Sequence, residues 1–205
     1  VTTCGLSNAG AASDGHGLHG TYTARSAAEL QIERTASEVA VTATVADPPF
    51  ALSRRIVTAV GQGHVRLDDR VVNDSDWTAA APLLYHVNIG VPLWDDDAYL
   101  ETDGHEVVPR DAAAAAGLPT WDEPPDPSAG APERVFEHVG ATWARLTSPR
   151  LGLELTVRSS LPRLWQWVEP AAGKYALAIE PANCSVLGRA HDMAAGRMPF
   201  LDPGE

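Results

Sequence analysis

The side chains best suited to chemistry in this sequence begin with a histidine and an asparagine two residues apart. In the run 83–90, Leu-Leu-Tyr-His-Val-Asn-Ile-Gly, His86 and Asn88 alternate with apolar residues. An extended strand places alternate residues on opposite faces, so the apolar set would face a core and the polar pair would face away from it. An imidazole can give or take a proton near neutral pH, and a carboxamide both donates and accepts hydrogen bonds. The pattern is typical of the floor of a polar ligand site, although a buried histidine bonded to a neighbouring strand would leave the same pattern.

A glycine-rich segment carries two more histidines. His16 and His19 lie between glycines in the run 15–20, Gly-His-Gly-Leu-His-Gly. Glycines allow the backbone to approach a ligand closely, which favours a binding loop. A flexible surface turn with exposed histidines is the alternative interpretation.

The third candidate is a carboxylate late in the chain. Glu180 ends the apolar run 175–179 and is followed by Pro-Ala-Asn. A carboxylate at the end of an apolar strand tends to be partly removed from water, which makes it a stronger base. A carboxylate on the solvated rim of a sheet is the competing interpretation.

One carboxylate and two imidazoles suit proton transfer, and they also suit a metal, because two histidines and one carboxylate form a known facial triad. The residues beside them are Gly, Leu, Asn and Pro, with no further ligand spacing. The sequence contains neither a Gly-x-Ser-x-Gly nucleophile elbow nor a phosphate-binding glycine loop followed by Lys-Ser or Lys-Thr. We therefore expect acid–base chemistry on a neutral polar molecule, with no cofactor and no metal, and a metal-dependent reaction is the alternative.

Composition narrows the partners. The chain has 205 residues, 15 basic against 27 acidic, and a net charge of −12. Such a surface repels phosphate backbones and anionic lipids, so we expect neither nucleic-acid nor membrane partners. No run approaches the roughly 20 apolar residues of a membrane span, and the N-terminus lacks a basic-then-apolar signal pattern. Two distant cysteines, Cys4 and Cys184, make no disulfide framework, which favours a cytoplasmic location.

The hydrophobic pattern predicts an all-β domain. Short runs rich in β-branched residues recur about 8–12 residues apart, as in a β-sandwich or barrel. Gly61–His64 joins two of these runs and suggests a hairpin, while the alanine-rich segment 111–118 is the best helix candidate. We expect residues 120–132, with five prolines, to form an exposed loop, and residues from 181 onward to be loop-like.

Seven short motifs occur in the order in which they recur in the aldose 1-epimerase-like (galactose mutarotase-like) superfamily, within its branch of largely uncharacterised proteins. They are Thr3–Asn8, Gly17–Gly20, Leu83–Leu93, Pro109–Ala112, Leu161–Trp167, Glu180–Asn183 and Pro203–Glu205. The chain thus resembles this superfamily over essentially its whole length. The resemblance implies an antiparallel super-sandwich with a sugar cleft on one sheet face. It is specific to the family and much less specific to a substrate.

The resemblance also implies residue roles. In mutarotases of this fold, a histidine before a glycine and a histidine from a His-x-Asn strand flank the pyranose, and a late glutamate faces the anomeric hydroxyl. The matching residues here are His19, His86 and Glu180. Glu180 would take the proton of the C1 hydroxyl while His86 protonates the ring oxygen, and His19 would hold a hydroxyl or stabilise charge. Ring opening, rotation about C1–C2 and closure on the other face would give the other anomer.

Four further residues are candidate sugar contacts, namely Asn8, Arg25, Asn88 and Trp167. The family branch usually carries an arginine directly after Gly-Leu-His-Gly, but Thr21 stands here and the nearest arginine is Arg25. Mutarotases also carry an arginine before the first histidine, for which Asn8 is the only obvious polar substitute. Trp167 or Trp165 could form an aromatic platform for a sugar face, and a core role is the alternative for at least one of them.

The sequence therefore predicts one domain over residues 1–205 that interconverts the anomers of a free monosaccharide or sugar derivative. A non-catalytic carbohydrate-binding protein is the first alternative, and a metal-dependent sugar isomerase or lyase is the second. The chain opens on Val1 without an initiator Met, and we expect both ends to lie within a longer family domain. Missing N-terminal strands would leave sheet edges exposed, and a homodimer is one possible assembly.

Overall fold

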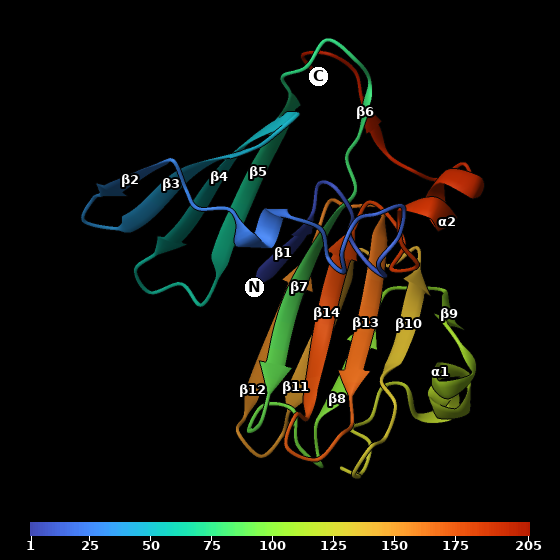
Figure 1. Cartoon of the computed structure of the whole chain (residues 1–205). Helices are drawn as coiled ribbons and strands as arrows, with labels where there is room; N and C mark the ends of the chain where they lie inside the picture. Colours follow the sequence, from blue (N-terminus) through green and yellow to red (C-terminus); the bar gives the residue numbers. More distant parts are fainter. The chain divides into compact units, whose positions relative to one another are not determined.

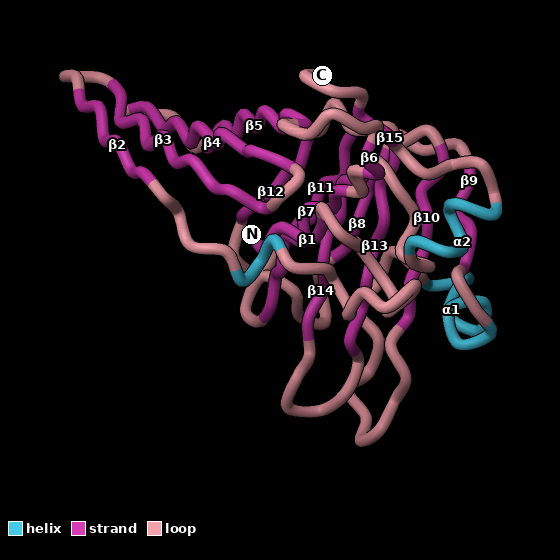
Figure 2. The backbone as a smooth tube through the Cα atoms, turned by 45° about the horizontal axis from the view of Figure 1, so that its top comes forward, coloured by secondary structure: helices cyan, strands magenta, loops and turns pink.

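Fifteen β-strands, two short α-helices and two 3₁₀ turns form the regular structure of the chain, which a computed structural model describes over all of residues 1–205 (Figures 1 and 2). Packing divides the residues into two units. Unit 1 comprises Val1–Cys4 and Leu83–Leu187, and unit 2 comprises Gly5–Pro82 and Gly188–Glu205. The single domain over residues 1–205 stays a prediction.

The elements of unit 1 are β1 (Thr2–Gly5), β7 (Leu83–Gly90), β8 (Tyr99–Thr102), β9 (Glu106–Pro109), α1 (Ala112–Gly117), η2 (Leu118–Thr120), β10 (Arg134–Val139), β11 (Trp143–Ser148), β12 (Leu153–Arg158), β13 (Arg163–Glu169) and β14 (Ala176–Ala182). Those of unit 2 are η1 (Tyr22–Ala24), β2 (Glu29–Arg34), β3 (Glu38–Asp47), β4 (Phe50–Ala59), β5 (Val65–Asn73), β6 (Ala79–Ala80), α2 (Arg189–Ala194) and β15 (Phe200–Leu201).

Unit 1 is built from two sheets with the core between them. The larger has the strand order β1-β7-β14-β13-β10-β9, and the smaller, which lies behind it in Figure 1, has the order β12-β11-β8. The core cluster takes alternate residues from strands of both sheets: Ile89, Leu100, Ala144, Leu146, Leu164, Val168, Leu177 and Ile179. Each valine, leucine or isoleucine side chain in this cluster contributes about 1.5–3 kcal/mol when fully buried. The period-2 alternation of the sequence therefore sets which face of each strand turns outward.

Unit 2 contains a four-stranded antiparallel sheet in the order β2-β3-β4-β5 and a small sheet in which β15 pairs with β6. The long strands are visible side by side in Figure 2. The hairpin predicted at Gly61–His64 is confirmed, because β4 and β5 pair from Phe50 opposite Asn73 to Thr58 opposite Val65.

The all-β prediction is confirmed, and the predicted helix at 111–118 appears as α1. Asp111 begins it, since its side chain accepts a hydrogen bond from the Ala114 backbone at 3.0 Å. The prediction of a loop-like tail from residue 181 is wrong, because β14 runs to Ala182 and α2 and β15 follow. These elements are too short to show a hydrophobic period. None of the helices is long and apolar enough to cross a membrane.

Candidate active site

The first two predicted site residues, His86 and Glu180, meet on neighbouring strands of unit 1. In the pairing of β7 with β14, Val87 lies opposite Ile179 and Asn88 opposite Ala178, which places His86 opposite Glu180. Nε2 of His86 lies 2.8 Å from Oε1 of Glu180, and the two side chains are only 14% and 5% exposed. Both point away from the core, because their neighbours Ile89, Leu177 and Ile179 fill it. The strand alternation therefore presents a hydrogen-bonded acid–base pair on the outer face of the sheet.

The surroundings of this pair favour the charged imidazole. Burial, the largest effect, disfavours the imidazolium, but hydrogen bonding to Glu180, the charge of Glu180 and hydrogen bonding to Asn88 together raise the pKa of His86 above its ordinary value of 6.5. The neighbouring Cys4 behaves in the opposite way: burial, assisted by the negative charge of Glu180, raises the pKa of its thiol to about 12. Cys4 is therefore a neutral thiol beside the pair and not a nucleophile.

The outer face continues beyond the pair as a row across four strands. Trp165 of β13 lies opposite Glu180, and Glu137 of β10 lies opposite Trp165. Cross-strand partners share a face, so His86, Glu180, Trp165 and Glu137 line up on one side of the sheet. Arg163, two residues before Trp165, reaches the same face and forms an ion pair with Glu137.

Glu137 and Arg163 are missing from the sequence prediction. Their side chains are 17% and 24% exposed, so the ion pair remains partly open to solvent. Arg163 lies within the motif Leu161–Trp167, but no local pattern distinguishes either residue from an ordinary surface charge. Only the registers of β10 with β13 and of β13 with β14 show that Glu137 shares the face of Glu180.

Trp167, a predicted sugar platform, lies beside the histidine of the pair. Its ring centroid is 5.5 Å from that of His86 with an interplanar angle of 65°, an edge contact. The indole N–H donates to Glu133 Oε2 at 2.7 Å, and Glu133 Oε1 lies 2.8 Å from Nη1 of Arg110. Burial favours the neutral acid of Glu133, but the hydrogen bonds from Trp167 and Arg110 outweigh it and lower the pKa of Glu133.

The motif Pro109–Ala112 thereby acquires a structural role. Arg110 also pairs with Asp111 at 2.7 Å, the residue that caps α1. A chain of charge-assisted hydrogen bonds thus leads from the start of α1 through Arg110 and Glu133 to the indole of Trp167. By contrast, Trp165, on the same outer face, is 4% exposed and donates to the carbonyl of Cys184 at 3.2 Å, so its indole is covered and offers little open surface to a sugar ring.

The remaining predicted residues lie in unit 2, apart from Asn88, which is exposed on β7. His19 has a positive φ of 63°, and its backbone N–H donates to the carbonyl of Gly10 at 3.1 Å. Asn8 is fully buried, and its carboxamide donates to the carbonyls of Ala11 and Gly17, both at 2.9 Å. It shapes the loop that carries the histidines, and its contact with a sugar stays a prediction, as does that of His19.

Arg25, the arginine nearest to the Gly-Leu-His-Gly motif, is held by an acid of the same unit. Its Nε lies 2.6 Å from Oδ1 of Asp47, and the hydroxyl of Thr21 donates to Oδ2 of Asp47 at 2.9 Å. Thr21, where the family branch carries arginine, and Arg25 therefore share one carboxylate.

One group of side chains has the spacing of a metal site. The carboxylates of Asp95, Asp96 and Asp97, which follow β7, have oxygens within 4.8 Å of one another. The guanidinium of Arg150 makes ion pairs with these acids, including a contact of 3.4 Å between Nη1 and Oδ2 of Asp95. An arginine thus supplies the positive charge at this cluster.

Comparison with solved structures identifies the fold. A "putative aldose 1-epimerase" from Klebsiella pneumoniae subsp. pneumoniae MGH 78578 matches with a TM-score of 0.85 at 22% identity, over 94% of this chain and 56% of that protein. A galactose mutarotase-like protein from Lactobacillus casei ATCC 334 matches with a TM-score of 0.61 at 18% identity, over 93% and 73% of the two chains. A galactose mutarotase-like protein from Clostridium acetobutylicum gives 0.57 at 15% identity, over 92% and 65%.

These similarities confirm the predicted galactose mutarotase-like, antiparallel β architecture. The chain spans about 56% of the length of the Klebsiella protein. No curated protein matches it in sequence. A family model does match, over residues 1–205, and the chain belongs to that family, which is described as "Domain of unknown function (DUF4432)".

Proposed function

We propose that the protein binds a free monosaccharide or sugar derivative on the outer face of the unit 1 sheet and interconverts its anomers. The observation that carries the proposal is the buried pair of His86 and Glu180, with 2.8 Å between Nε2 and Oε1. Ring opening of a cyclic sugar needs a base at the C1 hydroxyl and an acid at the ring oxygen, and this pair supplies both. The mutarotase-like fold supports the same choice by analogy.

The steps balance without a cofactor. Glu180 takes the proton of the C1 hydroxyl, the C1–O1 bond becomes a carbonyl and the bond from C1 to the ring oxygen breaks. The imidazolium of His86 gives its proton to that oxygen, and the surroundings that raise the pKa of His86 favour the imidazolium. After rotation about C1–C2 the same groups work in reverse, and closure on the other face yields the other anomer. Glu137 and Arg163 would bind sugar hydroxyls, and Trp167 would contact the ring.

A panel of free sugars tests the proposal. Exchange NMR or polarimetry should show at least one sugar whose anomers interconvert faster with catalytic amounts of protein than in buffer alone. Metal chelation should leave this rate unchanged. Failure of every sugar to respond would remove the isomerase proposal.

The activity is expected to decline once the pH rises above the raised pKa of His86. His86 must be protonated to act as the acid, and its pKa is raised above 6.5, so kcat/KM should fall as the pH rises through that raised value. A pH–rate profile measures this limb. His86→Gln should remove both this decline with pH and most of the rate. A wild-type rate that keeps increasing with pH would contradict the role of His86 as the acid.

Loss of the hydrogen bond between the indole of Trp167 and Glu133 is expected to weaken substrate binding. Glu133→Ala removes the acceptor that fixes Trp167, so KM should rise by about 3–10-fold, the cost of ordering one freed side chain on binding, with little change in kcat. Glu133→Gln keeps an acceptor for the indole N–H and should recover part of the loss. Equal losses of kcat in both variants would show that Glu133 acts on the chemistry instead.

A non-catalytic sugar-binding protein is the second candidate. The observation in its favour is that Arg25 is engaged with Asp47, while Thr21 occupies the position at which the family branch carries an arginine. Calorimetry that detects sugar binding, together with unchanged anomer exchange, would select this function over the first.

A further inference from the structure

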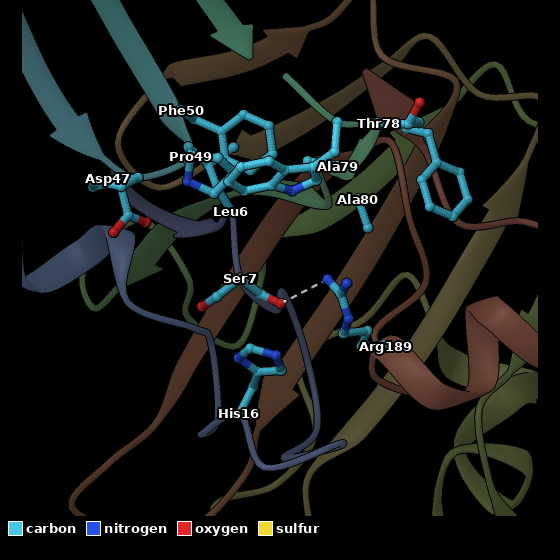
Figure 3. Close-up of a pocket in the computed structure, with 13 residues that line it drawn as sticks. Leu6, Ser7, His16, Asp47, Pro49, Phe50, Thr78, Ala79, Ala80 and Arg189 are labelled. Carbon is cyan, nitrogen blue, oxygen red and sulfur yellow. Dashed lines mark hydrogen bonds between the residues drawn. The ribbon is translucent and has the colours of Figure 1, made fainter. Parts of the chain in front are cut away.

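A cavity lies within unit 2, and none of its lining residues belongs to the outer face described above. It has a volume of about 400 Å³, within the range of about 300–1,000 Å³ that is usual for small-molecule sites. Figure 3 shows its lining, with Pro49, Phe50 and Ala79 on one side and Ser7, Arg189 and His16 on the other. The cavity therefore has an apolar side and a polar side.

The lining of the cavity includes three aromatic side chains, two of which are accessible. Phe50, at the start of β4, is buried, but Trp77 and Phe200 keep 59% and 49% of their surface exposed. Aromatic side chains gain most when a flat apolar group covers them, because they bring large areas out of water. These aromatic lining residues favour a planar hydrocarbon body.

The polar side carries a cation that no carboxylate neutralises. Nη1 of Arg189 donates to the backbone carbonyl of Ser7 at 3.2 Å. Arg189 forms no ion pair with any carboxylate of residues 1–205. A guanidinium has five N–H donors, so four remain available after this bond. They are sufficient to bind a carboxylate through two parallel hydrogen bonds. His16 lines the same side and can add one more donor or acceptor.

The one acid in the lining does not cancel this charge. Asp47 is buried, and its carboxylate accepts hydrogen bonds from Arg25 at 2.6 Å and from Thr21 at 2.9 Å. Its charge is therefore matched within its own ion pair. The positive charge of Arg189 is left to attract an anion, in a chain whose net charge is −12.

Arg189 is held in place before any ligand arrives. Its backbone N–H donates to Oδ1 of Asn8 at 3.1 Å, and the next residue, Ala190, donates to Oγ of Ser13 at 2.7 Å. Gly188 lies so close to this loop that an added Cβ would meet the carbonyl oxygen of Ala11 at 2.6 Å. Hydrogen bonds and close packing thus hold the loop that carries His16 against the segment that carries Arg189. Because the site is formed before the ligand arrives, binding has a lower entropic cost.

We propose that this cavity binds a small aromatic or otherwise planar carboxylate, with the carboxylate on Arg189 and the apolar body against Trp77 and Phe200. An inorganic anion alone would satisfy Arg189 and leave the aromatic wall uncovered. A neutral aromatic compound would cover the wall and leave the guanidinium without an anion. The site thus selects for both features in one molecule.

The test compares benzoate with benzyl alcohol, which has the same ring but no charge, by ligand-detected NMR titration of the purified protein. Benzoate is expected to bind with a Kd of about 1 mM or below, and at least about tenfold more tightly than benzyl alcohol. Arg189→Gln should reduce benzoate to the affinity of benzyl alcohol. Trp77→Ala, at an exposed position, should weaken both ligands, while Arg66→Gln, on the exposed surface of the same unit, should change neither.

Circular dichroism establishes that each variant is folded. The proposal fails if benzoate shows no binding at about 10 mM, roughly ten times the expected Kd. It also fails if benzoate binds wild-type protein no more tightly than benzyl alcohol, a comparison that does not depend on any variant. A folded Arg189→Gln variant with wild-type affinity for benzoate would overturn it as well. None of these outcomes depends on whether the outer face of unit 1 acts on sugars.

Discussion

Replacement of Glu180 by glutamine is expected to lower kcat/KM for anomer interconversion by about 10²–10⁴-fold, the usual contribution of a positioned general base. The amide has nearly the same shape as the carboxylate, and its oxygen can still accept a hydrogen bond from Nε2 of His86. It cannot take a proton from a sugar hydroxyl. Removing one partner of a buried ion pair costs stability, so circular dichroism should establish that the variant is folded at the pH of the assay.

Glu180→Gln should also change the titration of His86, which can be measured without any substrate. Glu180 is what raises the pKa of His86 against the opposing effect of burial. Once the carboxylate is gone, burial dominates, so an NMR titration should show His86 losing its proton at a lower pH in the variant than in the wild type. The pKa of Cys4 should also fall from about 12, since the negative charge beside it is removed.

Glu154→Gln is the matched control for this experiment. Glu154 is an exposed carboxylate on β12, in the smaller sheet of unit 1, and it touches neither His86 nor the row of residues on the outer face. Its replacement should leave both the rate and the titration of His86 unchanged. A Glu180→Gln protein that keeps most of the wild-type rate would show that Glu180 is not the base, even if the titration of His86 moves as expected.

The second large effect concerns stability at acid pH and originates in His138 of β10. This side chain is 1% exposed, and its Nε2 lies 2.9 Å from Oε1 of Gln166, which in turn donates to the carbonyl of Trp121 at 2.7 Å. Nε2 must carry the proton to donate to that oxygen, which leaves Nδ1 buried without a hydrogen-bond partner. The imidazole is thus built into the fold in its neutral form.

Burial lowers the pKa of His138 from 6.5 to about 4, despite the opposing hydrogen bond to Gln166. Between these two values the unfolded chain binds a proton that the folded chain does not, so stability is fully present above pH 6.5 and declines as the pH falls toward 4. The shift corresponds to a loss of about 3 kcal/mol, at 1.36 kcal/mol per pKa unit.

Urea unfolding at neutral pH and at pH about 4.5 measures this loss, and His138→Gln isolates it. The variant should be less stable at neutral pH, where its packing is imperfect, yet it should lose about 2–3 kcal/mol less than the wild type on acidification. Protonation of carboxylates affects both proteins and cancels in the difference. His64→Gln, in the exposed loop between β4 and β5, should keep the wild-type dependence. Parallel pH curves for wild type and His138→Gln would exclude His138 as the source.

Local pattern was sufficient to predict the elements and the face on which individual residues lie. The alternation in 83–90 predicted that His86 and Asn88 face away from the core, and the structure places Ile89 in the core cluster. The apolar run before Glu180 predicted a strand, which is β14. The hairpin at Gly61–His64 and the helix capped by Asp111 also follow from local signals. Period-2 patterning and turn or cap chemistry act over a few residues, so they can be recognised in a single sequence.

The composition of the outer face could not be predicted in the same way. Glu137 and Arg163 carry no local signal, and they join His86 and Glu180 only because β10, β13, β14 and β7 are neighbours in that order. The role of Arg110 likewise depends on Glu133 and Trp167, which are distant in sequence. In unit 2, Asn8 holds the backbone of Arg189, near the other end of the chain.

The sequence by itself determined that the chain is a β protein and which strand side chains face away from the core. It also determined that two imidazoles and a late carboxylate are the candidate acids and bases. Only the tertiary structure decided that His86 and Glu180 share a hydrogen bond, that Trp167 is fixed by Glu133 and that Arg189 lies at an aromatic cavity. The physical reason is that strand order and register are set by the burial of many core side chains at once, and no short segment encodes that shared packing.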